Sequence, residues 1–457
     1  MSDQFNASPQ EAQSKFRNVS IFVSELLLPS GVVAAICQEI GFSFRQRVYS
    51  PMVVVWMFVM QTLSADHSCQ QVVTRLNAWR MAQGLPRSSG DTTSYCQARS
   101  RLPIALFERL LAWTARKCDE AGVGDWRFRG REVVIVDGTT VTMADTRANQ
   151  TAYPQIANQQ PGCGFPLARI VHVFSLATGA ATMFAMGRYA GKETGETSLL
   201  RTLLSQFHSG EIVLADRYYA SFWLLALSEL RGIDVVARAH HLRKIDFRRG
   251  LRQGDCDQVV GYRKPQRPTW MTQREYESHP SSILVRHLRY QVTQPGFRTR
   301  QITLATTLLQ ADVYRAEDLA DLYRRRWQAE LHIRSLKTQM QMDHLRCKSP
   351  AMVQKELHCH MIGYNLVRAA MLATALKFRL PPWRLSFTGA MQAIEEFAAA
   401  LRWNPKQRDA QWTNVLQTIR QLEVGVRPDR NEPRELKRRA KEYKLMQTPR
   451  NRYTTAA

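Results

Sequence analysis

The amino-acid sequence predicts an α/β protein in which a mixed-sheet domain is interrupted by a β-rich insertion and flanked by helical regions. Three observations lead to this prediction. Up to about residue 128, apolar residues recur at three- and four-residue spacings, as in amphipathic helices. From Arg131 onward, β-branched runs alternate with helical segments. A basic stretch from Arg238 to Arg300 interrupts the alternation, which resumes with RQITLATTLL.

The N-terminal part of the chain is predicted to be helical. Its expected helices are Glu25–Glu39, Met52–Leu63, Cys69–Met81 and Thr92–Ala121. The segment SSGDTTSYCQARSRLP contains a turn, a cap and a short helix that carries Arg99 and Arg101. Such a helix could enter a DNA groove, and an ordinary surface helix with two solvated arginines explains the pattern equally well.

The following segments predict a mixed sheet. EVVIVDGTTV is a β-branched run that ends in Asp137-Gly138, and ARIVHVFSLATGAATMFAMG is a hairpin with a tight Thr-Gly turn. In order, the remaining elements are a helix over Ser198–Phe207, a buried strand ending at Asp216, a helix over Tyr218–Leu230, the strand IDVVARA and, after the insertion, a long helix over Ala316–Met342.

Positive charge is concentrated in two places. The chain of 457 residues has 63 Lys and Arg against 39 Asp and Glu, a net charge of +24. Arg238–Arg300 carries 14 basic and 5 acidic residues, and the tail Arg427–Tyr453 carries 10 and 4. Together these two stretches account for more than half of the excess of basic over acidic residues. This concentration indicates a polyanionic partner, and it favours nucleic acid over a membrane surface.

Composition excludes several classes of protein. The longest apolar run, Pro51–Met60, is too short to span a bilayer, and the polar first 20 residues do not form a secretory signal. Eight cysteines without a Cys-x-x-Cys pair fit a reducing compartment rather than a disulfide framework. We therefore expect a cytoplasmic protein.

Two aspartates follow buried strands, Asp137 in VVIVDGT and Asp216 in IVLADRYY. On adjacent strands their carboxylates would enter the crevice where open α/β sheets bind ligands. Either one alone is more simply a turn or cap residue.

The long helix carries a third acid. Tyr323, Arg326, Glu330 and Lys337 lie at i, i+3, i+7 and i+14, within an arc of roughly 60° on a regular helix. An apolar seam runs beside them, formed by Leu322, Ala329, Ile333, Leu336 and Met340. A solvated Glu–Arg face is the usual explanation of such pairs, but this polar stripe borders the buried face and predicts an active-site wall.

These motifs resemble a known family. The Tyr-x2-Arg-x3-Glu-x6-Lys pattern, the VDGTTV and ADRYY blocks, LRCKSP and the RPDRNEPRELKRR tail are similar to the bacterial insertion-sequence DDE transposases of the insertion sequence four family. The resemblance covers roughly residues 90–450. It implies a ribonuclease-H-like catalytic core that is interrupted by the β-rich insertion, with a helical N-terminal domain and a helical, basic C-terminal region.

The resemblance also implies a chemistry. Asp137, Asp216 and Glu330 would be the catalytic acids and would hold two Mg²⁺ ions, or Mn²⁺ as a substitute, with Asp137 bridging both. Three carboxylates are a hard-oxygen donor set that suits these ions, which assist in-line phosphoryl displacement. Tyr323, Arg326 and Lys337 would hold DNA phosphates.

Two further residues are assigned by resemblance. Arg238 is similar to an arginine that contacts DNA near the active site, and its alternative is an ordinary rim charge. Trp270 is the expected residue for stacking a flipped base during hairpin formation at the cut end. The alternative for Trp270 is a structural anchor of the insertion.

We expect the chain to be a DNA transposase that binds the ends of an insertion sequence, cuts them and transfers the strands, by cut-and-paste through a hairpin. Its partners would be double-stranded DNA and a second copy in a homodimer, at the bacterial nucleoid and without a membrane. The predicted domains are 1–128 (DNA-end binding), 129–237 and 301–400 (the two core parts), 238–300 (insertion) and 401–457 (C-terminal region). A nuclease without strand transfer and a non-catalytic DNA-binding relic remain as alternatives.

Overall fold

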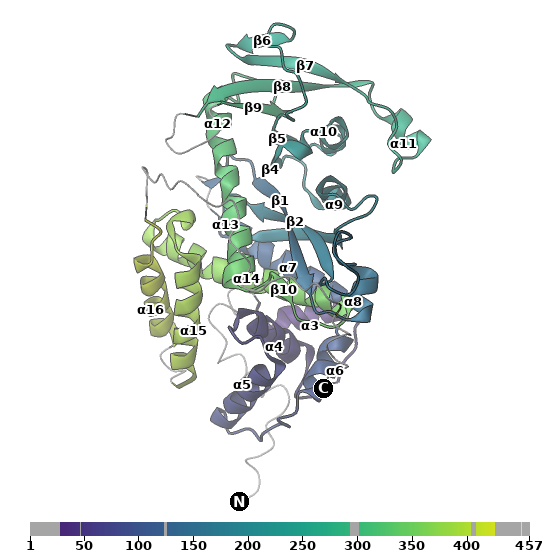
Figure 1. Ribbon diagram of the computed structural model, residues 1–457. Coiled ribbons are helices and arrows are strands. Elements are labelled where there is room, and N and C mark those ends of the chain that lie inside the picture. Colours follow the sequence, from purple (N-terminus) through teal and green to yellow (C-terminus); the bar gives the residue numbers. More distant parts are fainter. Residues whose placement is uncertain are drawn as a thin grey trace, which may run out of the picture.

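One large mixed sheet organises the protein (Figure 1). The computed structural model describes residues 28–45, 47–122, 126–292, 301–403, 408–425 and 449, so the predicted basic tail lies almost wholly outside the described residues. Within these ranges ten strands run in the order β3-β2-β1-β4-β5-β9-β8-β7-β6, and β10 pairs with β1. The strands are β1 (Val133–Met143), β2 (Leu167–Ser175), β3 (Ala181–Arg188), β4 (Ile212–Ala215), β5 (Asp234–Arg238), β6 (Leu251–Gly254), β7 (Asp257–Arg263), β8 (Ser282–Gln291), β9 (Gln301–Thr306) and β10 (His344–Leu345). The predicted α/β class with a mixed sheet is confirmed.

The long central strand β1 has unequal neighbours. It pairs antiparallel with β2 along nine residues, whereas the short parallel strand β4 covers only Val133–Ile135. On the same edge β10 pairs with Thr142 and Met143. The stretch of β1 that begins at Asp137 therefore lies in a notch between β4 and β10.

The strands of the predicted insertion extend the core sheet. β9 pairs with β5 on one edge and with β8 on the other, and β7 and β6 continue outward. This pairing provides hydrogen-bond partners for the backbone N–H and C=O groups at the strand edges, which would be unpaired in an isolated insertion. Residues 293–300, at its end, lie outside the described residues, and the boundary at 238–300 stays a prediction.

Helices cover both faces of the core sheet (Figure 1). On one face, α9 (Glu196–Leu203) and α10 (Phe222–Glu229) pack against Val134, Val136 and Val213. On the other face, α12 (Ala316–Arg324) packs against Val133 and Ile135. This alternation follows from the two-residue period of a strand, because successive side chains point to opposite faces.

The expected long helix over Ala316–Met342 is not regular. After α12 comes a 3₁₀ turn at Arg325–Trp327, then α13 (Gln328–Arg334) and a π-helical segment at Ser335–Gln339. Its apolar seam is buried as predicted, with Leu322, Ala329, Leu336 and Met340 in the core.

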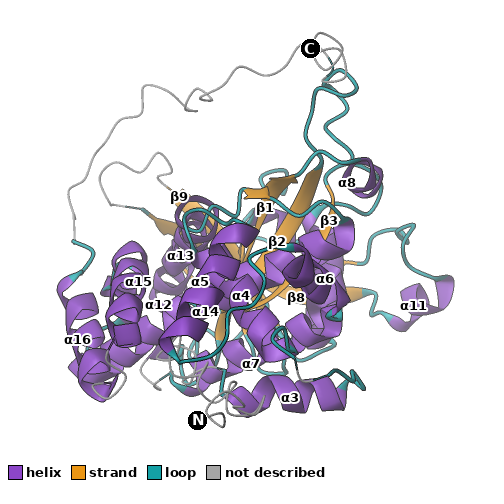
Figure 2. Ribbon diagram, turned by 90° about the horizontal axis from the view of Figure 1, so that it is seen from below, coloured by secondary structure: helices purple, strands orange, loops and turns teal. Residues whose placement is uncertain are grey.

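A central helix, α14 (Pro350–Phe378), joins the sheet to the N-terminal helices. It is buried along most of its length and packs against α4, α7, α15 and α16, and Figure 2 shows the helices gathered below the strands. The other helices are α3 (Ser30–Glu39), α4 (Pro51–Leu63), α5 (Cys69–Ala82), α6 (Thr93–Arg101), α7 (Ile104–Glu120), α8 (Arg147–Ala152), α11 (Gln273–Ser278), α15 (Phe387–Trp403) and α16 (Arg408–Gln421). The predicted single run Thr92–Ala121 is two helices, because Pro103 disfavours a helical conformation in the residue before it.

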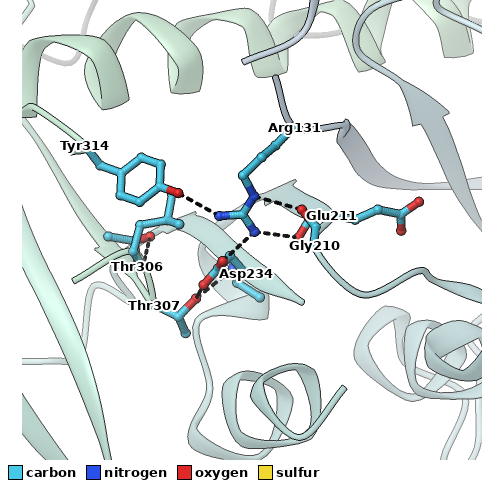
Figure 3. A network of polar contacts seen from close by, with 9 residues as sticks. Arg131, Gly210, Glu211, Asp234, Thr306, Thr307 and Tyr314 are labelled. Atoms are coloured by element: carbon cyan, nitrogen blue, oxygen red, sulfur yellow. Dashed lines mark hydrogen bonds and ion pairs between the residues drawn. The ribbon is translucent and has the colours of Figure 1, made fainter. Parts of the chain in front are cut away.

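A polar network ties the strands together at the end opposite the notch (Figure 3). Arg131, just before β1, donates to the carbonyl oxygen of Gly210 at 2.8 Å and to the Tyr314 hydroxyl at 2.9 Å, and pairs with Asp234. The Thr307 hydroxyl donates to the same Asp234 carboxylate at 2.6 Å. The beginnings of β1, β4 and β5 and the segments around β9 and α12 are thereby held in register.

Candidate active site

The notch brings the two predicted aspartates next to each other. β1 and β4 are parallel, with Ile135 opposite Leu214, so Asp137 and Asp216 each lie two residues beyond that pair. The Asp216 carboxylate accepts a hydrogen bond from the Tyr218 amide at 2.7 Å, and that of Asp137 accepts one from the Gly138 amide at 3.0 Å. Asp216 is thus also the cap residue that directly follows β4. Asp137 instead lies inside β1, which continues to Met143, so the prediction that both aspartates follow their strands is wrong for Asp137. The reason is that β2 pairs with β1 along almost its whole length and extends the strand past Asp137.

Arg326 lies between two of the three predicted acids. Its guanidinium is 3.8 Å from the Asp137 carboxylate and 3.4 Å from the Glu330 carboxylate. The negative charge of Asp216 also acts to raise the pKa of this guanidinium. The Glu330 side chain is 42% exposed and that of Arg326 only 18%, so Glu330 is the acid most open to a partner from solution.

The irregular helix turns Lys337 toward β1. Its ammonium donates to the carbonyl oxygen of Thr140 at 2.8 Å and to the Thr139 hydroxyl at 3.3 Å. Lys337 lies in the π-helical segment, and such segments often occur at functional sites. Tyr323 is buried at the other end of the stripe.

Burial shapes the protonation of this region. It raises the pKa of the Asp137 carboxyl, and the charge of Arg326 opposes the shift. Burial likewise raises the pKa of the Tyr323 hydroxyl, against the effect of Arg326 and Arg238, and lowers the pKa of Lys337. Arg238 is the last residue of β5.

Trp270 lies apart from the carboxylates, in an aromatic cluster. The Arg201 guanidinium stacks on its ring, 3.7 Å from the centroid, and the Trp223 ring meets it edge-on at 6.2 Å. Trp223 in turn contacts Tyr276 and His279. The ring is half-buried and joins the insertion to α9 and α10.

Arg99 and Arg101 on α6 have different surroundings. The Arg99 guanidinium stacks on Phe58, 4.6 Å from the ring centroid, and donates to the side chain of Gln61 at 3.1 Å. Arg101 is exposed. A DNA contact for Arg99 therefore has no support from its position, because its charge is directed into the helical core.

Glu196, at the start of α9, is a residue that sequence reasoning missed. Burial raises the pKa of its carboxyl, the charges of Asp137 and Asp216 raise it further, and the charge of Arg169 opposes the shift. The Tyr219 hydroxyl donates to it at 3.3 Å. In the sequence, the only signal was an acid at a helix start next to Gly195, a pattern typical of ordinary helix N-termini.

A model of the family described as Transposase DDE domain matches residues 128–366, the stretch that includes all the carboxylates above. The chain belongs to the DDE transposases. The predicted resemblance to transposases of insertion sequences is confirmed.

The transposase is 25% identical over 438 residues to the transposase InsG for insertion sequence element IS4 of Escherichia coli K12, a match that covers 93% of this chain and 94% of the relative. Over 64 residues, 14% of this chain and 17% of the relative, it is 38% identical to the transposase for insertion sequence element IS421 of E. coli. Among solved structures it is similar to a piggyBac transposase synaptic complex with hairpin DNA, with a TM-score of 0.45 and 10% identity over 96% of this chain and 89% of that one.

The described residues contain neither a preassembled metal site nor a membrane-spanning helix. No group of three His, Cys, Asp or Glu side chains there is close enough to hold a metal ion as it stands. No helix in the same part of the transposase combines the length and apolar character needed to cross a membrane.

Proposed function

We propose that this transposase cuts the ends of its own insertion sequence and joins them to target DNA at a site formed by Asp137, Asp216 and Glu330. The observation that carries the proposal is that the Arg326 guanidinium lies 3.8 Å from the Asp137 carboxylate and 3.4 Å from the Glu330 carboxylate, while Asp216 lies level with Asp137 beyond the neighbouring strand β4. Asp137 lies within β1, Asp216 directly follows β4, and Glu330 lies in α13. Nothing in DNA binding alone requires three acids around one point, since DNA is itself an anion.

The donor set fits divalent cations. Asp137, Asp216 and Glu330 offer hard carboxylate oxygens, and Arg326 supplies the positive charge among them in this structure. When bound, two Mg²⁺ ions would activate the attacking water or 3′-hydroxyl and offset charge at the scissile phosphate. The residues of the chain would hold and orient the DNA around that point.

The remaining signature residues would bind phosphates. Lys337 is fixed against β1 by hydrogen bonds to Thr139 and Thr140, so its ammonium is preorganised to meet a phosphate. Arg326 would exchange its carboxylate contacts for phosphate oxygens, which match its planar fork of donors. Tyr323 and Arg238 would contact the strand on the side of Asp216.

We further propose a ribonuclease-H-like core. The strand order β3-β2-β1-β4-β5, with β2 antiparallel to its neighbours and β1, β4 and β5 parallel, supports it. The flanking parts would be an end-binding helical region with Arg101 at its surface, the β-rich insertion, and a C-terminal region that contributes to a homodimer. The protein would act on nucleoid DNA in the bacterial cytoplasm.

Strand transfer tests the function directly. Pre-cut element ends with a free 3′-hydroxyl, incubated in Mg²⁺ with a supercoiled plasmid, are expected to become covalently joined to that plasmid. Both steps are in-line displacements at phosphorus, so one site can perform them. Cutting of uncut ends without any joining would instead identify a nuclease, and binding without either reaction would identify a DNA-binding relic.

Trp270→Ala tests the hairpin route. We expect the variant to nick element ends at the wild-type rate and to lose hairpin ends, because the stacked base loses an aromatic partner worth about 1–3 kcal/mol. Denaturing gels of end-labelled DNA would measure both products, with the melting temperature as a control for folding. If the variant melts at a lower temperature and loses nicking as much as hairpin formation, Trp270 is instead the structural anchor. Its contacts with Arg201 and Trp223 suggest that role.

A further inference from the structure

A fourth carboxylate reaches the notch from the other face of the sheet. Glu196 begins α9, which packs on the face opposite to α12 and α13. A Cβ atom built on Gly138 would lie 2.2 Å from Cδ of Glu196 and 2.4 Å from its Oε1. The Glu196 carboxylate thus occupies the space above the residue that follows Asp137, and only glycine leaves that space open.

The same carboxylate is tied to the second aspartate block. It accepts a hydrogen bond from Tyr219 at 3.3 Å, and Tyr219 is fully buried three residues after Asp216. Glu196 is therefore held between the backbone beside Asp137 and the turn that carries Asp216. An acid that merely stabilised the start of α9 could point into solvent and would need neither contact.

This arrangement gathers negative charge in one partly buried notch, where three carboxylates repel one another. Arg326 approaches Asp137 from the α13 side, at 3.8 Å, and Arg169, which donates to the carbonyl oxygen of Thr194 at 3.3 Å, offsets part of the charge of Glu196. A divalent cation would offset the repulsion that remains. We propose that Glu196 is an additional ligand-bearing residue of the active site, which together with Asp137 and Asp216 holds a divalent cation from the α9 side. The inference rests on the proposed three-carboxylate metal site and extends it to four.

Mn²⁺ binding to the full-length protein without DNA, followed by electron paramagnetic resonance, tests the inference apart from activity. Glu196→Gln is expected to weaken Mn²⁺ binding about ten- to a hundredfold, as loss of a residue that supports a metal site does. Glu229→Gln is the matched control, because Glu229 is an exposed glutamate on the adjacent helix α10. It should bind Mn²⁺ like the wild type.

Gly138→Ala provides a second, independent variant. The three atoms nearest to the added methyl group all belong to the flexible Glu196 side chain, so the chain should fold while the carboxylate is displaced. We expect the same loss of Mn²⁺ affinity as in Glu196→Gln and no further loss in the double variant, since both changes remove one interaction. Additive losses would overturn the inference.

Thermal melting separates ligation from a structural role. In EDTA, Glu196→Gln should melt no lower than the wild type, because it removes a repulsive charge, and it should lose most of the rise in melting temperature that Mn²⁺ produces. A lower melting temperature in EDTA with unchanged Mn²⁺ affinity would show that Glu196 only supports the fold.

Asp137→Asn separates failure of the inference from failure of the proposed function. If Asp137→Asn loses Mn²⁺ binding and Glu196→Gln retains it, the three-carboxylate site stands and Glu196 is excluded from it. If Asp137→Asn also binds Mn²⁺ normally, the proposed metal site is wrong and Glu196 has no metal to hold.

Discussion

Replacing Glu330 by glutamine is expected to reduce DNA cleavage by more than about a thousandfold, equivalent to about 4 kcal/mol of transition-state stabilisation, and to leave binding of the element ends unchanged. Glutamine has the same shape as glutamate and can still accept a hydrogen bond from Arg326, which lies 3.4 Å away, so the fold should persist. What it lacks is the negative charge, which a divalent cation needs from its ligand.

Labelled DNA that carries the element's own ends, incubated with Mg²⁺, would measure this effect. The flanking genomic sequence supplies those ends, and gel shifts would report binding separately. Glu317→Gln is a suitable control, because Glu317 lies on the first turn of the preceding helix α12 with its side chain 74% exposed. Cleavage by Glu330→Gln at the rate of the control would remove Glu330 from the site.

The second large effect is expected on stability, in Arg286→Met. Arg286 is completely buried in β8, donates to the Asp257 carboxylate at 2.8 Å and to the carbonyl oxygen of Tyr314 at 2.7 Å. Removal of one partner of such a pair leaves an uncompensated buried charge and costs about 3–5 kcal/mol. The strands β7 and β8 should therefore lose much of their protection, since this pair joins them to the segment that leads into α12.

Hydrogen exchange of β7–β9 and denaturant unfolding would measure the loss. Arg252→Met is the matched control: the Arg252–Asp255 pair is the same kind of interaction in the same region, but its side chains are 73% and 94% exposed. The control should change stability by at most about 0.5 kcal/mol. The double variant Arg286→Met with Asp257→Leu should recover part of the loss, because no unpaired charge remains. A single variant as stable as the control would show that the pair contributes nothing.

Much of the fold could be predicted because it is encoded locally. The strand around Asp137, the hairpin and the strand before Asp216 have the periodicity and turn residues of β-structure. The helix stripe from Tyr323 to Lys337 and its buried seam were also predictable. The breaks in that helix were not, because 3₁₀ and π segments have no sequence period of their own.

The candidate site was predictable only in part. Asp137, Asp216 and Glu330 belong to motifs, and motifs are read from neighbouring residues in the chain. The roles of Glu196 and Arg99 instead depend on residues that are distant in the chain. The importance of Glu196 depends on Gly138 and Tyr219, and the inward direction of Arg99 depends on Phe58 and Gln61. None of these contacts follows a spacing rule.

The sequence by itself determined which segments become strands and helices, and to which family the chain belongs. Only the tertiary structure decided that β9 pairs with β5, so that the insertion continues the core sheet, and that α9 directs Glu196 into the notch beside Asp137. The reason is physical. Backbone conformation responds to neighbours within a few residues, whereas sheet order and side-chain encounters are settled by packing between segments far apart in the chain.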